Sequence, residues 1–228
     1  LTADIDFSDY NMSIGIDYHD FDAVFDGQGH KLTIKRVKTD GSENCAPFQC
    51  LMGTVKNLWI DGTITSNGKY AASVASHIWK AGAVIENVLS TVTIESSVQG
   101  DATNAGILGV ADNPVTLKNC VFAGKLTTTG GTSNCGGLIG WASAATTLIN
   151  CLMVGDIEVG ENDTHTISRN GGNCNMQNVW VSKYFANSQQ GELASAEMLA
   201  SGELAYKLGM GQQIGQDVAD TAGRCAFG

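Results

Sequence analysis

The sequence predicts an all-β protein: a parallel β-helix, or solenoid, of about five coils with a short helical C-terminal region. Five segments repeat one pattern, in which an apolar residue and a spacer precede an asparagine, and an apolar residue or cysteine follows it. The repeated asparagines are Asn57, Asn87, Asn119, Asn150 and Asn178, which lie 30, 32, 31 and 28 residues apart. A near-constant period is typical of solenoids, in which each repeat buries its apolar face by stacking on its neighbours.

The segment around each asparagine is predicted to be a β-strand, because apolar residues alternate there with a period of two. The residues one and three positions after each asparagine are expected to point inward. They are Leu58 and Ile60, Val88 and Ser90, Cys120 and Phe122, Cys151 and Met153, and Val179 and Val181. Because Cys120 and Cys151 share a column with aliphatic residues, they are predicted to be small core residues rather than disulfide or metal ligands. The pairing of the other cysteines is left open.

Two further short strands are predicted in each repeat. One is rich in small residues and begins near Tyr70, Asn104 and Asn134; its glycines Gly109 and Gly140 are 31 residues apart, in step with the asparagines. The other is rich in threonine and covers 63–65, 91–94, 125–129 and 156–159. Three short strands per repeat, with no helical pattern between them, favour a parallel β-helix over a leucine-rich repeat.

The asparagine column is expected to be structural. Equivalent positions of a parallel solenoid lie about 4.8 Å apart from coil to coil, so each side-chain amide is able to donate to one neighbour and accept from the other. Such a ladder also satisfies backbone groups where the chain turns between strands. We therefore predict that the five asparagines support the fold rather than bind a ligand.

The two ends of the chain differ from the repeat. Residues 24–34 show a strand, a glycine-rich turn and another strand, which is typical of a first, incomplete coil. From Ser195 to Gly209 the apolar spacing changes to that of one or two short amphipathic helices, with Gly209 as a C-cap. A helix there would protect an exposed strand edge. The predicted domains are a β-helix over 1–190 and a C-terminal helical capping region and tail over 191–228.

The composition argues against several classes of partner. The net charge is −10, with 13 Lys and Arg against 23 Asp and Glu. Binding to nucleic acid or to an anionic membrane surface requires clustered basic residues, so neither is expected. No apolar run is long enough to span a bilayer, so no membrane insertion is expected. The chain opens on LTADIDFSD without an initiator methionine, which indicates a piece of a longer protein; the missing signal sequence therefore carries little information.

No catalytic residues and no metal ligands are predicted. Glycoside hydrolysis needs two carboxylates about 5 to 9.5 Å apart, and no column of equivalent repeat positions carries such a pair. The four histidines show no HxH or HExxH spacing, so a zinc site is not expected. Two N-terminal acidic runs are interpreted as solvated surface, with a Ca²⁺ site as the alternative. They are Asp4, Asp6 and Asp9, and then Asp17, Asp20, Asp22 and Asp26.

One outward-facing column is unexpectedly apolar. The position two residues after each asparagine holds Trp59, Leu89, Val121, Leu152 and Trp180. An apolar stripe on an exposed sheet usually marks a surface on which something packs. Two explanations are open: a loop or the C-terminal helices cover the stripe, or part of it, with Trp59 or Trp180 at the rim, receives a partner or stacks on sugar rings.

Several segments resemble the GLUG-motif proteins, a group of β-helix surface proteins of gut-type anaerobic bacteria. The resemblance is carried by GGLIG (Gly136–Gly140) followed by TLINCLMVGDI, with a looser copy in NAGILG. APFQCLMGTVKNLWIDG from Ala46 is similar to the opening coil of the family. The flanking segments LTADIDFS, FDGQGHKLTI and SGELAYKLG are similar as well. SVASHI from Ser73 and SRNGGNCNM from Ser168 depart from the glycine-rich pattern. The resemblance implies a right-handed, pectate-lyase-like parallel β-helix that is secreted or displayed at the cell surface.

Three hypotheses of function follow. The first is a non-catalytic extracellular or cell-surface module for adhesion, which recognises a glycan or a host or bacterial surface protein. The second is a polysaccharide hydrolase or lyase whose carboxylates come from loops outside the repeat columns. The third is a structural spacer in a larger surface protein. None of them calls for a cofactor, apart from the Ca²⁺ that the acidic runs leave open.

Overall fold

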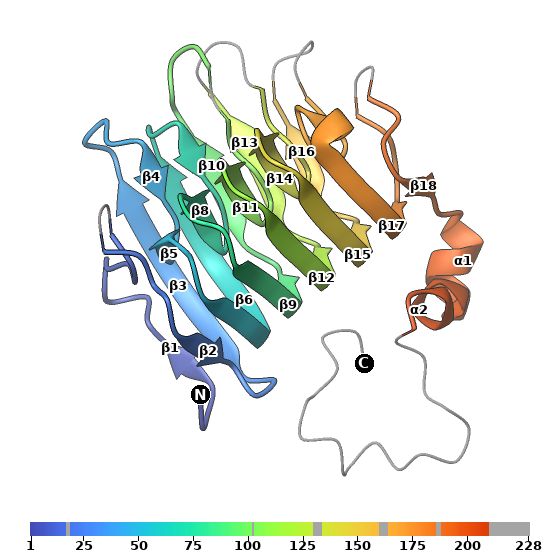
Figure 1. Cartoon of the computed structure of the whole chain (residues 1–228), viewed down its shortest axis with the longest axis horizontal. Helices are drawn as coiled ribbons and strands as arrows, with labels where there is room; N and C mark the ends of the chain where they lie inside the picture. Colours follow the sequence, from blue (N-terminus) through green and yellow to red (C-terminus); the bar gives the residue numbers. More distant parts are fainter. Residues whose placement is uncertain (17–18, 102, 130–133, 160–163, 186–187, 210–228) are drawn as a thin grey trace.

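The computed structural model describes residues 1–16, 19–101, 103–129, 134–159, 164–185 and 188–209. The chain forms a right-handed parallel β-helix of about six turns with two short helices, which confirms the predicted fold class. Figure 1 shows the turns side by side, from the N-terminal coil to the helices beyond β17. Residues 210–228, which hold Cys225 and the predicted tail, and Asp17 of the second acidic run lie outside the described residues.

The first face of the solenoid carries the repeat asparagines. Its strands are β2 (Val24–Asp26), β6 (Thr54–Ser66), β9 (Ala83–Ser90), β12 (Val115–Phe122), β15 (Thr146–Met153) and β17 (Cys174–Val181). The N-terminal coil, which the sequence predicted as incomplete, contributes β2 and pairs with β6 in parallel. Together with the five repeats that contain an asparagine, this coil gives the solenoid about six turns.

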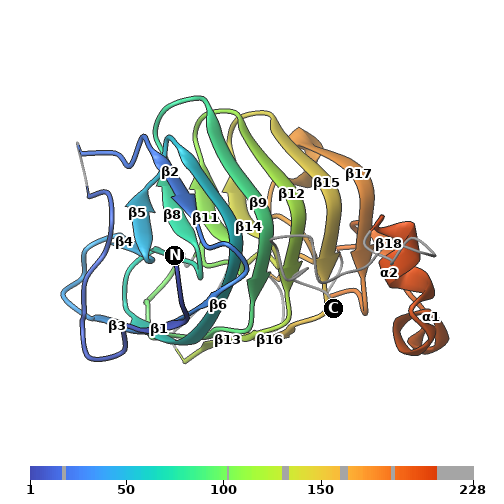
Figure 2. The same cartoon turned by 90° about the horizontal axis from the view of Figure 1, so that it is seen from below.

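Two further faces close the solenoid. The second face holds β1 (Ile5–Asp6), β3 (Lys31–Lys38), the second half of β6, β10 (Thr93–Ser96), β13 (Lys125–Thr128) and β16 (Asp156–Glu158). The third is a sheet of β5 (Phe48–Cys50), β8 (Ala75–Ile78), β11 (Leu108–Ala111) and β14 (Ile139–Ala142). A short pair, β4 (Asn44–Cys45) and β7 (Tyr70–Ala71), precedes it. Figure 2 looks from below and shows the chain passing from β12 and β15 into β13 and β16.

The core lies between the three faces. All ten residues predicted to point inward are buried, so the period-two alternation is confirmed. Burying one large aliphatic side chain contributes about 1.5–3 kcal/mol to the free energy of folding. Because each turn buries such side chains, this contribution recurs in every turn. The thiols of Cys120 and Cys151 lie in this core, where Sγ of Cys120 donates to the carbonyl oxygen of Ile85 at 3.3 Å. Burial raises the pKa of Cys120 well above its ordinary value, so this thiol stays protonated.

Each asparagine occupies the left-handed region of backbone space. The φ angles of Asn57, Asn87, Asn119, Asn150 and Asn178 lie between 51° and 55°. Asparagine enters this region more readily than other residues with a side chain, because its short amide bonds locally. The five residues therefore bend the chain at the same place in every turn.

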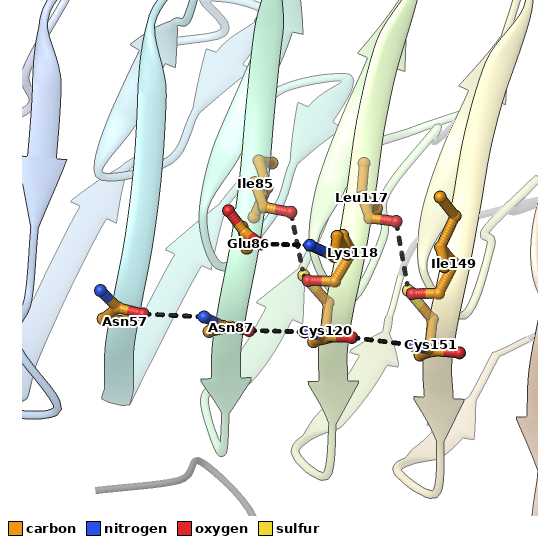
Figure 3. A network of polar contacts seen from close by, with 11 residues as sticks. Asn57, Ile85, Glu86, Asn87, Leu117, Lys118, Cys120, Ile149 and Cys151 are labelled. Carbon is orange, nitrogen blue, oxygen red and sulfur yellow. Dashed lines mark hydrogen bonds and ion pairs between the residues drawn. The ribbon is translucent and has the colours of Figure 1, made fainter. Parts of the chain in front are cut away.

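The same five side chains form a continuous ladder of hydrogen bonds. Nδ2 of Asn87 donates to Oδ1 of Asn57 at 2.8 Å, and the bonds from Asn119, Asn150 and Asn178 to the preceding amide measure 2.7, 3.2 and 2.8 Å. Figure 3 shows the part of this row that begins at Asn57 and Asn87 and continues across the next two strands, with the Glu86–Lys118 ion pair (2.7 Å) beside it. Every Nδ2 donates toward the N-terminal end.

Both ends of the ladder are closed. At the N-terminal end, Nδ2 of Asn57 donates to the carboxylate of Asp26 at 3.0 Å. Because an ionised carboxylate only accepts, Asp26 has no donor that would require a further partner. At the C-terminal end, Nε1 of Trp180 donates to Oδ1 of Asn178 at 2.7 Å, and Nδ2 of Asn178 also donates to the carbonyl oxygen of Lys207 at 2.8 Å. No polar atom of the column is left without a partner at either end.

The C-terminal region contains the predicted short helices, α1 (Ala196–Ser201) and α2 (Glu203–Lys207). Ser195 caps α1 by accepting from the N–H of Met198, and Gly202 separates the helices with a φ of +80°. Ahead of them, β18 (Glu192–Leu193) pairs with β17, the last strand of the first face. A 3₁₀ turn spans Gly171–Asn173. Neither described helix has the length and apolar character needed to cross a bilayer.

We predict that Asn119→Gly lowers the free energy of unfolding by about 1–3 kcal/mol, because two ladder bonds are lost while glycine still adopts a positive φ. Asn119→Ala should cost about 1–2 kcal/mol more, since alanine also carries the left-handed penalty. Urea unfolding followed by circular dichroism measures both. A glycine variant as stable as the parent protein would show that the ladder contributes no stability.

Candidate functional site

The C-terminal helices cover one end of the outward apolar stripe. A second apolar cluster joins three stripe residues to three C-terminal residues: Val121, Leu152, Trp180, Ala194, Leu204 and Leu208. Trp180 is only 7% exposed, and Nζ of Lys207 lies 5.3 Å from its ring centroid. Of the two explanations left open, an exposed rim at Trp180 does not hold, because α2 and the segment before α1 pack against this side chain. At this end of the stripe, the cover by helices is the explanation that fits.

The other end of the stripe stays partly open. Trp59 is 38% exposed and Leu89 is half-buried. Nε1 of Trp59 donates to Oγ1 of Thr91 at 2.9 Å, and Nζ of Lys31 lies 5.0 Å from the ring centroid of Trp59. The indole of Trp59 is therefore held by a hydrogen bond and a cation contact, and it is the most exposed side chain of the stripe.

The N-terminal acidic residues serve turns and ion pairs. Oδ1 of Asp4 accepts from the N–H of Lys31 at 3.0 Å, and Asp20 pairs with Lys80 at 2.8 Å. Asp26, besides ending the ladder, accepts from the N–H of Gln28. Within the described ranges, no three His, Cys, Asp or Glu side chains gather in a way that would hold a metal ion.

A groove over the third face brings together charged and aromatic side chains. We call it the outer groove; its volume is about 180 Å³ and its lining residues are Lys69, Tyr70, Asp101, Thr103, Val110, Asp112, Trp141 and Arg169. Two repeat glycines let neighbouring segments approach this sheet closely. A Cβ at Gly109 would come within 3.1 Å of Cβ of Tyr70, and a Cβ at Gly140 within 2.7 Å of the carbonyl oxygen of Thr103. The backbone of these strands thus lies close to two residues that line the groove.

Aromatic side chains lie in and beside the outer groove. His77, Val110 and Trp141 are register partners on β8, β11 and β14, so they stack in one column of the third face. The ring of Trp79 stacks on His77 with 3.7 Å between centroids and 20° between planes, and Tyr70 meets His77 edge-on at 5.6 Å. Trp79 is 48% exposed. Of these aromatic residues, Tyr70 and Trp141 line the groove itself.

Asp101 is the charged centre of the groove wall. Its Oδ1 accepts from Nη1 of Arg169 at 2.6 Å and from Nδ2 of Asn134 at 2.6 Å, and Nζ of Lys69 lies 3.5 Å from Oδ2. Arg169 also lies over the face of Trp141, with Cζ 4.6 Å from the ring centroid. Burial raises the pKa of Asp101, but the Asn134 hydrogen bond and the charges of Arg169 and Lys69 outweigh burial and lower the pKa overall.

Asp112 sits on the other side of the groove. Its Oδ2 lies 2.7 Å from Nε2 of the buried His77, and the hydroxyl of Ser143 donates to Oδ1. Burial raises the pKa of Asp112, but these two hydrogen bonds and the nearby imidazole lower it overall. Because an ionised carboxylate only accepts, His77 carries a proton on Nε2. Its Nδ1 is buried and has no hydrogen-bond partner among the described residues.

This arrangement does not match two familiar catalytic patterns. In a Ser-His-Asp triad, the serine hydroxyl bonds to the imidazole that activates it; here the Ser143 hydroxyl bonds to Asp112 instead. In glycoside hydrolysis, one carboxyl must keep its proton near neutral pH, which requires a raised pKa. Both groove carboxyls have a lowered pKa. The groove offers fixed acceptors, fixed donors and aromatic faces.

The sequence analysis missed the outer groove because it compared columns of the asparagine strands. Asp101 lies in a loop, and Asp112 directly follows β11, so neither falls in those columns. A signal was nevertheless present. SVASHI, which supplies His77, and SRNGGNCNM, which supplies Arg169, are the two segments that depart from the glycine-rich repeat. Departures from an otherwise consistent pattern often mark functional positions.

Comparison with known proteins shows a similarity of fold to a solved structure. No protein-family model matches the sequence, and neither does any protein in a search of curated sequences. A crystal structure of a protein named "putative immunoglobulin A1 protease" from Bacteroides ovatus is similar, with a TM-score of 0.64 and 17% sequence identity over 90% of this chain and 80% of that one. At this identity the likeness concerns the fold alone. The resemblance to GLUG-motif proteins stays a prediction from the sequence.

We predict that Asp101→Asn lowers the melting temperature at pH 7 and that this difference shrinks in acid. The native pKa of Asp101 lies below its ordinary value of 3.8. The ion pairs therefore stabilise the fold above pH 3.8, and this contribution is lost as the pH falls through the lower native pKa. Thermal unfolding of both proteins between pH 7 and pH 2.5 measures it. Asp9→Asn, at an exposed position, is the control; a constant difference for Asp101→Asn across this range would contradict the prediction.

A second prediction concerns the helical cover. Leu204→Ala should destabilise the packing of α2 on the stripe by about 2–4 kcal/mol, because Leu204 is 3% exposed and its removal leaves a cavity. Leu199→Ala is the matched control, since Leu199 is 38% exposed. Hydrogen–deuterium exchange should accelerate in α1, α2 and β17 for the Leu204 variant only. Equal protection in both variants would show that the helices are not held by this cluster.

Proposed function

We propose that this chain is a non-catalytic, extracellular or cell-surface recognition module that binds carbohydrate in the outer groove. One observation carries the proposal: aromatic faces stand next to fixed, ionised hydrogen-bonding groups in a single concave site. Trp141 and Tyr70 line the groove together with Asp101, Asp112 and Arg169. Concave sites with apolar faces and a few convergent polar groups are the usual form of small-ligand sites.

Carbohydrate fits this combination of groups. A sugar ring has an apolar C–H face, which an aromatic ring is able to cover, and a rim of hydroxyls, which need donors and acceptors in fixed positions. Carboxylates that are already held by neighbours form strong, charge-assisted hydrogen bonds with hydroxyl groups. The ion pairs and the ring contact of Arg169 hold these groups before a ligand arrives, which reduces the entropy lost on binding.

Recognition is a better proposal than hydrolysis or lysis. The polysaccharide-cleaving alternative needs a carboxyl that donates a proton, and the lowered pKa values of Asp101 and Asp112 work against that role. The fold neighbour is named for proteolysis of immunoglobulin A1. A serine- or cysteine-type protease mechanism here would need an activated hydroxyl or thiol, and the His77–Asp112 pair presents neither to the imidazole among the described residues.

Secretion and adhesion belong to the same proposal. The GLUG resemblance in the sequence suggests display at a cell surface, and a solenoid presents a long, regular side to a glycan or to a host or bacterial surface protein. The net charge of −10 is unfavourable for nucleic acid as a partner. The spacer hypothesis differs in one respect: it requires no ligand in the outer groove.

We predict that Trp141→Ala lowers glycan binding at least tenfold, because the ring that would cover the sugar is removed. The test is a glycan array of plant and host polysaccharides, followed by calorimetry on the ligands found. Trp59→Ala is the matched control: it removes an indole of the apolar stripe, away from the groove lining, and should leave binding unchanged.

Other results would point elsewhere. Loss of binding in Trp59→Ala alone would move the site to the apolar stripe. Turnover of any polysaccharide would favour the enzyme, and neither binding nor turnover would favour the spacer.

A further inference from the structure

We infer that the outer groove selects neutral sugars and rejects sugars that carry a carboxylate, such as uronic acids. This inference rests on the proposed function and specifies the ligand of the same site. It follows from the way in which the charges of the groove are paired.

The charges that line the groove cancel. Lys69 and Arg169 are its cations, and Asp101 and Asp112 are its anions. Both cations are directed at the same carboxylate: Arg169 lies 2.6 Å from Oδ1 of Asp101, and Lys69 lies 3.5 Å from Oδ2. An incoming carboxylate would have to compete with Asp101 for these partners and gain little from either.

Asp112 adds repulsion on the opposite wall. Its hydrogen-bond donors are the Nε2–H of His77 and the hydroxyl of Ser143. Lys69 and Arg169, the two basic residues of the lining, form ion pairs with Asp101 and not with Asp112. The lowered pKa keeps the Asp112 carboxyl ionised at neutral pH. A ligand carboxylate in the groove would therefore meet a second negative charge at short range, which disfavours its binding relative to that of a neutral group.

A neutral sugar meets no such conflict. Its hydroxyls donate to the two carboxylates, which have more acceptor positions than their protein partners use. The groove of about 180 Å³ is much larger than the space that a single water needs. It therefore has room for a small ligand. At longer range, the net charge of −10 also slows the approach of polyanions.

The experiment compares pairs of methyl glycosides that differ only at C6. The probes are methyl galactoside with methyl galacturonide and methyl glucoside with methyl glucuronide, titrated into the parent protein at pH 7 and followed by saturation-transfer difference NMR. We expect at least one neutral glycoside to bind, with an affinity at least tenfold above that of its uronide partner. This ratio is measured on the unaltered protein, so it does not depend on the folding of any variant.

A pair of variants tests the cause. Asp101→Asn releases Lys69 and Arg169 and should raise the affinity for the uronide at least tenfold relative to the neutral glycoside. Asp156→Asn is the matched control, because Asp156 is also a partly exposed carboxylate in an ion pair, here with Lys183. Asp156 lies on β16 and does not line the groove. The Asp156 variant should leave the ratio unchanged; an equal shift in both variants would assign the selectivity to net charge and overturn the inference.

The outcomes separate this inference from the proposed function. A uronide that binds the parent protein as well as, or better than, its neutral partner overturns the selectivity and leaves carbohydrate recognition intact. If no glycoside and no arrayed glycan binds, carbohydrate recognition and the selectivity inferred from it are both wrong.

Discussion

The asparagine at each corner of the solenoid combines two constraints in one side chain. Its backbone, with φ between 51° and 55°, bends the chain at the same point of every turn. Its side-chain amide donates a hydrogen bond to the equivalent amide of the preceding turn, so equivalent residues of successive turns stay in register. Since a slip of one residue in a strand would exchange its inward and outward side chains, this alignment fixes which residues form the core and which face outward.

The ladder has a direction, and both of its ends depend on residues outside the repeat. The acceptor-only carboxylate of Asp26 ends the row of donors in the first coil. At the other end, Trp180 and the carbonyl oxygen of Lys207 complete the bonds of Asn178. The C-terminal helices thus close the polar column with the same segment that covers the apolar stripe. The segment that completes the hydrogen bonds of Asn178 is thus also the segment that buries Trp180.

The outer groove arises where the solenoid departs from its own repeat. The absence of a side chain at Gly109 and Gly140 lets Tyr70 and Thr103 approach the third face closely. Asp101 and Arg169, which lie outside the strands, line the same groove. The groups that these loops contribute are paired before any ligand is present: Asp101 with two cations, and Asp112 with His77 and Ser143. Such pairing removes the cost of unpaired charges and leaves a rigid, electrically balanced site.

The sequence alone determined the period, the inward-facing residues and the change to helices after Ser195, because each of these patterns is local and recurs in every turn or lies within one segment. It did not determine which part of the outward stripe is open, since burial of Trp180 depends on helices that follow it in sequence and return to pack on it. Nor did it assemble the groove. Arg169 and Asp101 are separated by 68 residues and lie outside the regular strands, so only the stacking of turns brings them together.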